Sequence, residues 1–462
     1  MQVFRYSGPE FSPYGDDERV AATDPGPWRA PVASGPVAAV LALPGSKSLT
    51  NRELVLAALA NAPSLLRSPL ISRDTLLMVE ALRSLGVGIE DVPTDSVFGP
   101  DWLVTPGDLE GGTSIDCGLA GTVMRFLPPL AALALGPVAF DGDAGARRRP
   151  MRTTIDSLRA LGVDVNDDGR GTLPFSLYGT GEVTGGDLEI DASASSQFVS
   201  GLLLAAPRFT EGLRLRHTGE RLPSMPHIEM TIACLAQRGV TVDSPEPGVW
   251  VVPTSDIAGR QVDIEPDLSN AAPFLVAALV AGGSVTITGW PETTTQVGAD
   301  LEHLLPRFGA TVSRAGDELT VTAGAGIDGV DLDLSTGGEL APALVALAAL
   351  ASGPSRITGI GHLRGHETDR LAALTAEING LGGAVAELDD GLEIAPRPLH
   401  GGAWHSYEDH RMATAGAIIG LKVAGVEIDD IATTAKTLPQ FPELWSSMLA
   451  EPHATVDSIG II

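Results

Sequence analysis

One pattern recurs six times along the chain and limits the possible folds more than any other feature. A short polar turn leads into an apolar helix rich in Ala and Leu, then a short strand, an amphipathic helix and two strand-like segments. Successive turns lie roughly 70 residues apart, and so long a period indicates a duplicated subdomain instead of a solenoid repeat. The turns begin at Gly45, Asp116, Asp191, Pro266, Ser335 and Ser406.

Each unit therefore predicts the order βαβαββ, and the six units divide naturally into two α/β domains of three units. The first helix of every unit is almost entirely apolar, so we expect these helices to form a buried inner layer. We expect the amphipathic helices of the first five units at 75–85, 153–161, 228–238, 298–308 and 369–381. Two such domains facing each other would aim helix N-termini into one cleft, where the positive potential suits anionic substrates.

The charge balance makes the few basic positions informative. The formal net charge is −28 at pH 7 and the pI is near 4.5, which argues against a nucleic acid or an anionic membrane as partner. The 30 basic residues include only three lysines, Lys47, Lys422 and Lys436. Because arginine is the usual cation here, a retained lysine indicates a need for a compact or deprotonatable ammonium group.

Cysteine content and apolar runs indicate the compartment. Cys117 and Cys234 show no paired spacing, so we expect a reducing environment and no disulfide framework. The N-terminus has no basic segment followed by an apolar one, and apolar runs such as 341–351 are too short to span a bilayer. We therefore predict a cytoplasmic protein. Residues 1–32 are rich in Pro, Gly and Asp without periodicity, which predicts a poorly ordered extension.

The turn at 44–48 is the first candidate for an anion site. Ser46 and Ser48 are good N-cap residues, and a helix N-terminus offers free N–H groups and the positive end of the helix dipole. Lys47 lies at the mouth of this turn, and Ser48 and Arg52 are four residues apart on one helix face. The alternative is a capped helix start with solvated basic residues.

The equivalent turns of the other units carry different polar groups at the same point of the repeat. Taken singly, each could be a helix cap or a solvated cluster, but six caps would not need such different chemistries. Gly121 permits close backbone approach, and we expect one arginine of the 147–149 cluster to face the cleft. The other candidates are Arg125, Ser195, Ser196, Gln197, Ser224, Glu339, Glu367, Arg370, Asp409, His410, Arg411 and Lys436.

Together these motifs resemble the enolpyruvyl transferase family, in particular its members that act on shikimate 3-phosphate. In chain order they are Pro-Gly-Ser-Lys-Ser-x-Thr-Asn-Arg, Ala-Gly-Thr-x-Met-Arg, Ser-Ser-Gln-Phe, Glu-Thr-Asp-Arg, Asp-His-Arg-Met and Ala-Lys-Thr-x-Pro, within about residues 35–447. The resemblance implies a two-domain inside-out α/β barrel, each domain with three βαβαββ units. It also implies an N-terminal domain at 46–263 and a C-terminal domain at 33–45 plus 264–462.

The resemblance implies an enzyme that transfers the enolpyruvyl group of phosphoenolpyruvate to the 5-hydroxyl of shikimate 3-phosphate and releases phosphate. Family members work by addition and elimination, without a metal or an organic cofactor. We therefore expect a monomer whose partners are these two small molecules.

The same resemblance assigns roles to the motif residues. The implied ligands of shikimate 3-phosphate are Lys47, Ser48, Arg52, Ser195, Ser196, Gln197, Ser224, Glu339 and His366. The implied ligands of phosphoenolpyruvate are Lys47, Gly121, Arg149, Gln197, Arg370, Arg411 and Lys436. The implied catalytic residues are Lys47, Glu339, Glu367 and Lys436, and we expect Arg125 to support the Gly121 loop.

Four positions depart from the commonest family pattern: Glu339 replaces Asp, His366 replaces Lys, His362 replaces Asn and Phe126 replaces Pro. A histidine at 366 can bind phosphate, but with a charge that depends on pH. In the family, a glycine at position 121 accompanies glyphosate sensitivity, so we expect inhibition competitive with phosphoenolpyruvate.

Two alternative functions remain open at this point. One is enolpyruvyl transfer to UDP-N-acetylglucosamine, although the comparable loop at 142–147 lacks the Cys usual in that enzyme. The other is an inactive homologue that only binds a phosphate-bearing ligand.

Overall fold

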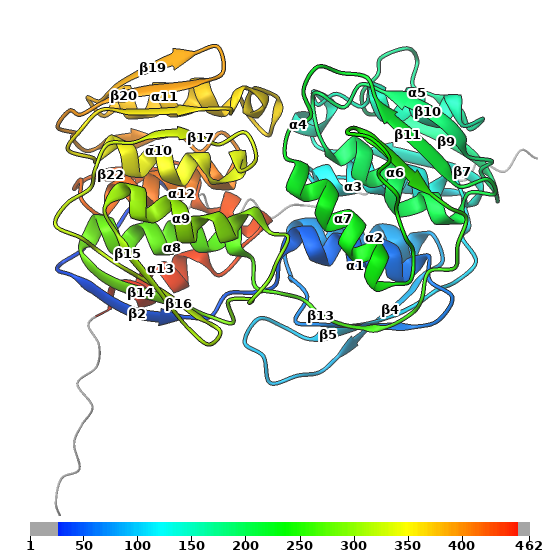
Figure 1. The fold of residues 1–462 in the computed structure, drawn as a ribbon, viewed down its shortest axis with the longest axis horizontal. Helices are drawn as coiled ribbons and strands as arrows, with labels where there is room; N and C mark the ends of the chain where they lie inside the picture. The colour runs from blue at the N-terminus through cyan, green and yellow to red at the C-terminus, as the bar shows by residue number, and fades with distance from the viewer. Residues whose placement is uncertain (1–25, 451–462) are drawn as a thin grey trace, which may run out of the picture.

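The computed structural model describes residues 26–450 of the 462-residue chain, and these form two α/β domains side by side (Figure 1). Most of the predicted N-terminal extension, 1–25, lies outside the described residues. Within residues 26–450, no helix combines the length and apolar character needed to cross a bilayer.

The N-terminal domain contains three small sheets. Their strands are β3 (Ser64–Arg67), β4 (Gly88–Val92), β5 (Asp101–Thr105), β6 (Thr113–Asp116), β7 (Leu135–Asp141), β8 (Asp164–Asn166), β9 (Phe175–Thr180), β10 (Gly186–Ile190), β11 (Leu213–His217), β12 (Val249–Val252) and β13 (Gln261–Asp263). The strand orders are β13-β3-β5-β4, β6-β7-β9-β8 and β10-β11-β12. In each sheet the first pair is parallel and the added strands are antiparallel, as the βαβαββ unit requires.

The C-terminal domain repeats this arrangement with strands from both ends of the chain. Its strands are β1 (Trp28–Arg29), β2 (Val37–Leu41), β14 (Gly283–Thr288), β15 (Thr311–Ala315), β16 (Glu318–Thr322), β17 (Asp331–Asp333), β18 (Ser355–Thr358), β19 (Ala384–Leu388), β20 (Gly391–Ala395), β21 (Gly402–Trp404) and β22 (Val426–Ile428). They form sheets in the orders β15-β16-β14-β2, β17-β18-β20-β19 and β1-β22-β21.

The first helices of the units form the inner layer of each domain, as predicted. They are α1 (Lys47–Ala58), α3 (Gly121–Ala131) and α6 (Gln197–Ala205), and then α8 (Leu268–Ala281), α10 (Ala341–Ala349) and α12 (His410–Gly420). Within each domain the three helices contact one another. Every residue of α3 and α10 is buried, because α10 carries only apolar residues and α3 carries apolar or small residues apart from Arg125.

The remaining helices follow the second strand of each unit or connect elements. The α-helices are α2 (Arg73–Ser84), α4 (Ala144–Arg147), α5 (Arg152–Ala160), α7 (Met225–Gln237), α9 (Leu301–Leu304), α11 (Arg370–Gly380) and α13 (Phe441–Leu449). Short 3₁₀ helices are η1 (Ala206–Arg208), η2 (Val297–Asp300), η3 (Leu305–Phe308), η4 (Gly338–Leu340), η5 (Gly361–Gly365) and η6 (Ile431–Lys436).

Two chain segments cross between the domains and pair with each other. Ser46 N donates to Glu265 O at 2.7 Å, and Asp267 N donates to Pro44 O at 2.9 Å. One buried core draws on residues 54–257, and the other on β2, residues 268–448 and a few residues near β1. We therefore propose that the domains divide at 46–263 against 33–45 plus the chain from 264 onward.

Several parts of the fold differ from the sequence-based expectation, and among them the third unit has one closing strand, β12, instead of two. Residues 28–29, assigned to the poorly ordered extension, form β1 and pair antiparallel with β22. The sixth unit lacks two closing strands within the described residues, because η6 and α13 follow β22 and β1 supplies the neighbouring strand. A two-residue strand is too short to show alternation, so the sequence did not reveal it.

Candidate active site

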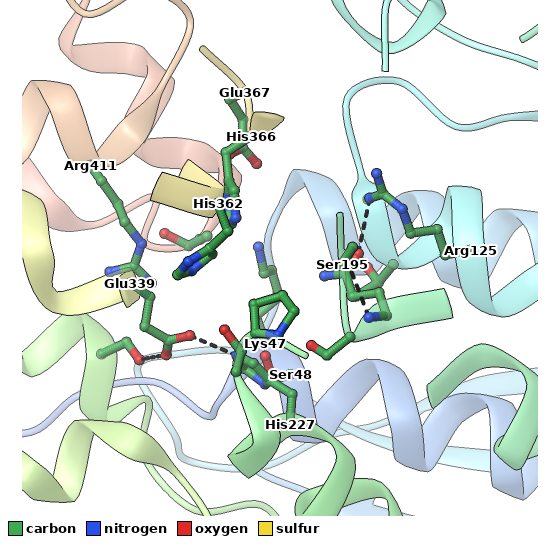
Figure 2. Close-up of a pocket in the computed structure, with 18 of the residues that line it drawn as sticks. Lys47, Ser48, Arg125, Ser195, His227, Glu339, His362, His366, Glu367 and Arg411 are labelled. Atoms are coloured by element: carbon green, nitrogen blue, oxygen red, sulfur yellow. Dashed lines mark hydrogen bonds and ion pairs between the residues drawn. The ribbon is translucent and has the colours of Figure 1, made fainter. Parts of the chain in front are cut away.

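A cavity lies between the two domains at the N-terminal ends of the inner helices (Figure 2). The predicted site residues that line it are Lys47, Ser48, Gly121, Arg125, Arg149, Ser195, Ser196, Gln197, Ser224, Glu339, His362, His366, Glu367, Arg370, His410 and Arg411. Two other predicted ligands, Arg52 and Lys436, lie behind this lining.

The N-terminus of α1 brings Lys47 and Ser48 to the cavity. Ser46 caps the helix, and its Oγ accepts from Leu49 N at 3.5 Å. Lys47 Nζ donates to Asp74 Oδ2 at 3.4 Å, while 20% of the lysine side chain stays exposed. An ammonium group has three donors, so Lys47 retains donors for an anion in the cavity.

Gly121, the first residue of α3, leaves space on which polar groups converge. A β-carbon built on Gly121 would lie 2.8 Å from Arg125 Nη1, 3.0 Å from Arg149 Nη2 and 3.1 Å from Gln197 Oε1. The Nε atoms of Arg125 and Arg149 are buried and have no hydrogen-bond partner within residues 26–450. Buried cationic donors without partners indicate that an anion completes this part of the site.

The turn before α6 adds neutral groups. Ser195 Oγ accepts from Gln197 N at 3.3 Å, and Gln197 Oε1 accepts from Arg125 Nη1 at 3.0 Å. Ser224 precedes α7 in a left-handed conformation, with φ of 54°. Hydroxyl and amide groups donate and accept, so this wall suits a ligand that carries both hydroxyl groups and phosphate oxygens.

Glu339, in η4, faces the cavity from the C-terminal domain. Its Oε2 lies 2.7 Å from His227 Nε2 of α7, and its Oε1 accepts a hydrogen bond from Ser269 Oγ. Burial favours the neutral acid, but the imidazole of His227 and the charge of Arg411 hold the pKa of Glu339 below its usual range. Glu339 is therefore an ionised carboxylate that can accept a proton.

Glu367 joins a second set of charged groups. Its Oε1 accepts from Lys436 Nζ at 2.5 Å, and its Oε2 accepts from Arg370 Nη2 at 3.0 Å. Arg370 Nε also donates to Asp409 Oδ2 at 2.7 Å, so its guanidinium is held from two sides. Burial opposes ionisation of Glu367, but Lys436 and Arg370 together keep its pKa well below the usual range.

The remaining lining groups include an arginine without a side-chain partner. The Arg411 guanidinium makes no hydrogen bond or ion pair among residues 26–450, while its backbone N–H donates to Asp409 Oδ1 at 2.9 Å. The rings of His362 and His366 lie with centroids 5.8 Å apart. Burial and the charge of Arg370 lower the pKa of both imidazoles. At neutral pH, His366 thus does not supply the charge that a lysine would.

Arg52 is a predicted ligand that the structure places outside the cavity lining. It is 1% exposed, and its guanidinium donates to Thr231 Oγ1 at 2.8 Å, Ser48 O at 2.9 Å and His227 O at 2.8 Å. The guanidinium also lies 5.2 Å from the Phe126 ring centroid. The face of α1 that carries Arg52 packs against α6 and α7, so its donors are used between helices and not in the cavity.

Lys436 lies one contact behind the cavity. It is 5% exposed, lines a neighbouring interdomain cavity, and donates to Leu119 O at 3.3 Å across the domain boundary. Its contact with the cavity therefore runs through Glu367. The motif predicted that Lys436 lies near the site, but it could not show that the side chain is buried behind the cavity lining.

Polar lining residues that sequence reasoning missed include His227, Asp267 and Ser269. His227 follows Ser224 by three residues at the start of α7, and that spacing could have placed both on one face. Asp267 caps α8 and accepts from Asn270 N at 3.0 Å and from Lys47 N at 3.1 Å. The repeat indicated the turn that contains Asp267. The contact with Lys47 could not be predicted, because it forms only where the two segments that cross between the domains pair with each other.

Comparisons with known proteins agree with one another. A family model described as EPSP synthase (3-phosphoshikimate 1-carboxyvinyltransferase) matches residues 32–445. A 3-phosphoshikimate 1-carboxyvinyltransferase from Kocuria rhizophila is 58% identical over 428 residues, which cover 91% of this chain and 96% of that protein.

Two solved structures share the fold. An EPSP synthase from Acinetobacter baumannii superposes with a TM-score of 0.73 at 24% identity, covering 91% of this chain and 97% of that one. The enolpyruvyl transferase NikO from Streptomyces tendae gives a TM-score of 0.72 at 18% identity, covering 90% of this chain and 96% of that one.

Proposed function

The chain belongs to the EPSP synthase (3-phosphoshikimate 1-carboxyvinyltransferase) family, and on that premise we propose which side chains bind each substrate and move each proton. The enzyme transfers the enolpyruvyl group of phosphoenolpyruvate to the 5-hydroxyl of shikimate 3-phosphate, giving 5-enolpyruvylshikimate 3-phosphate and phosphate. The reaction is a step of the shikimate pathway to aromatic amino acids. UDP-N-acetylglucosamine is therefore not its acceptor, and the chain is not an inactive homologue.

Phosphoenolpyruvate binds around Gly121 in this proposal. The observation that carries it is the pair of guanidinium groups of Arg125 and Arg149, whose Nη atoms lie beside the glycine and whose Nε atoms are buried without a partner in the described chain. Arg411, also without a side-chain partner in the described chain, adds a further cation, as do Lys47 and Arg370. Planar guanidinium groups match carboxylate and phosphate oxygens in pairs, and this substrate carries both groups.

Shikimate 3-phosphate binds along the neighbouring wall of the N-terminal domain. Ser48, Ser195, Ser196, Gln197 and Ser224 supply donors and acceptors there, without adding charge. Arg52 takes a different role in this proposal. It fixes the carbonyl groups of Ser48 and His227 from behind, and so positions both residues.

Two carboxylates divide the proton transfers. In the addition step, the 5-hydroxyl oxygen attacks C2 of phosphoenolpyruvate, Glu339 takes the hydroxyl proton, and Glu367 with Lys436 delivers a proton to C3. In the elimination step, the same pair removes a proton from C3 and phosphate leaves. Fixed cations around the cavity hold the phosphate and carboxylate groups in place throughout the reaction, which lowers the barrier without solvent reorganisation.

Paired variants test the division between the two substrate sites. Ser195→Ala should raise the KM for shikimate 3-phosphate about tenfold or more, while Arg411→Ala should do the same for phosphoenolpyruvate, since each removes a hydrogen bond to a charged ligand. Ser193→Ala, in the same turn but outside the cavity lining, is the matched control. The assignment would be refuted if either variant raised the KM for the other substrate instead, or if neither variant changed a KM.

We also propose that the enzyme acts as a monomer in the cytoplasm. Both walls of the cavity come from one chain, and Cys117 and Cys234 are free and buried, as suits a reducing compartment. Light scattering that showed a dimer at assay concentration would contradict the monomer.

A further inference from the structure

A histidine that no motif predicted contacts the candidate base from the opposite domain. His227 lies in the first turn of α7 in the N-terminal domain, and Glu339 lies in η4 of the C-terminal domain. His227 Nε2 and Glu339 Oε2 are 2.7 Å apart, and Figure 2 shows the two side chains joined by this contact. Because an ionised carboxylate only accepts hydrogen bonds, Nε2 must carry the hydrogen.

Buried contacts fix both members of this pair. The carbonyl oxygen of His227 accepts from Arg52 Nη2 at 2.8 Å and from Thr231 Oγ1 at 3.0 Å, so the backbone that carries the imidazole is held by a buried arginine. On the other side, Ser269 Oγ donates to Glu339 Oε1. Each carboxylate oxygen has two lone pairs, so Glu339 can still accept the hydroxyl of an acceptor while it keeps both partners.

We infer that His227 is the positioning residue of Glu339: from the opposite domain it orients the carboxylate toward the acceptor hydroxyl. This inference rests on the proposed role of Glu339 as the base. It also gives the departure at position 339 a reason. An aspartate would withdraw the carboxylate by about one carbon–carbon bond, roughly 1.5 Å, which breaks a contact of 2.7 Å.

Other charged groups face the pair from several elements. Arg411 of α12 and Arg370 of α11 favour ionisation of Glu339, as does Arg52 of α1 from behind. Asp267 at the start of α8 opposes it, and His362 of η5 lies close enough to be influenced by Glu339. These groups remain in every variant below, so a difference between variants reports the contact at position 227.

The test is the pH dependence of kcat/KM in two variants. His227 lowers the pKa of Glu339 through its charge and its hydrogen bond, so removing them destabilises the ionised form of the carboxylate. His227→Gln keeps an N–H donor but no charge, and His227→Phe keeps neither. We expect the acid limb of both profiles to move up by about one pH unit. At pH 7, kcat/KM should fall about tenfold or more in His227→Phe and by a smaller factor in His227→Gln. The substrate phosphates titrate alike in every assay, and His400→Gln, at an exposed position, is the matched control.

A second measurement separates positioning from a purely structural role. If His227 acts through Glu339, then His227→Gln should cost little in a chain that already carries Glu339→Asp, because the contact is already broken. Additive losses, or an acid limb that stays in place in both variants while circular dichroism shows a folded chain, would overturn the inference. Glu339→Gln tests the premise separately: full activity would refute Glu339 as the base, whatever the His227 variants do.

Discussion

Lys436 Nζ lies 2.5 Å from Glu367 Oε1, and their side chains are 5% and 9% exposed. The ammonium group reaches a carbonyl of the other domain, while the second oxygen of the carboxylate is held by Arg370. This places a proton donor and a proton acceptor in direct contact at the cavity wall. A proton can therefore reach Glu367 through Lys436 without passing through the substrates.

Removing either member of this pair should abolish most turnover. Glu367→Gln and Lys436→Met should each lower kcat by about 100-fold or more, the usual size of a general acid–base contribution. The KM for shikimate 3-phosphate should change little, since neither side chain lies on that wall. Lys422→Met, at an exposed position, controls for loss of a lysine. A kcat within threefold of wild type for Glu367→Gln would remove Glu367 from the mechanism.

Lys47 should be needed as lysine and not only as a charge. Its ammonium group fits between Asp74 and the cavity, whereas a guanidinium is larger, planar and differently aimed. We expect Lys47→Arg to lower kcat/KM at least about tenfold, or about 1.4 kcal/mol of transition-state stabilisation. Steady-state kinetics with both substrates varied measures this. Near wild-type values would show that any cation suffices.

Gly121 should control the room available to phosphoenolpyruvate. The added β-carbon of Gly121→Ala would crowd Arg125 Nη1 at 2.8 Å, so the anion or the arginine must shift. We expect the KM for phosphoenolpyruvate to rise about tenfold, with little change for shikimate 3-phosphate.

Glyphosate extends this test, because it should compete with phosphoenolpyruvate and is the longer molecule. The alanine variant should therefore lose more affinity for glyphosate than for phosphoenolpyruvate. Insensitivity of the unaltered enzyme to millimolar glyphosate would contradict the expectation.

A structural carboxylate outside the site predicts how stability depends on pH. Asp167 accepts from Arg159 Nη2 at 2.6 Å and from Gly171 N at 2.7 Å, and the hydrogen bond from Arg159 lowers its pKa from 3.8 to about 2. A lowered folded-state pKa stabilises the fold above the unfolded value, and that stability is lost as pH falls from about 4 toward 2.

Asp167→Asn should therefore cost stability at neutral pH, about 1–3 kcal/mol, since a buried acceptor is weakened. Thermal unfolding of the variant and the unaltered chain is compared at pH 7, 4, 3 and 2.5. The difference between their unfolding temperatures should become smaller in the acid range. Asp168→Asn, at an exposed position, is the control. A difference in unfolding temperature that stays constant down to pH 2.5 would show that the lowered pKa of Asp167 does not cause it.

Periodicity predicted the larger part of the fold. Each unit repeats the same polar turn and apolar helix, so the pattern predicted buried inner helices, and α3 and α10 are buried throughout. The turns also mark the cavity, because an inner helix presents its N-terminus at the same edge in every unit. Lys47, Gly121 and Glu339 line the cavity for that reason.

Contacts between distant segments could not be predicted in this way. The spacing of Ser48 and Arg52 gives a shared helix face, but only the packing of α1 on α7 shows that Arg52 is used against His227 O. His227 itself meets Glu339 only when the domains come together. Depth and interdomain contact are properties of tertiary packing, and a local pattern does not encode them.

Phosphate release from phosphoenolpyruvate tests the central claim most directly. The purified chain should release phosphate when shikimate 3-phosphate is added, and Glu339→Gln and Glu367→Gln should each suppress that release. UDP-N-acetylglucosamine, as the control acceptor, should give none. Release with UDP-N-acetylglucosamine alone, or undiminished release from both variants, would contradict the account.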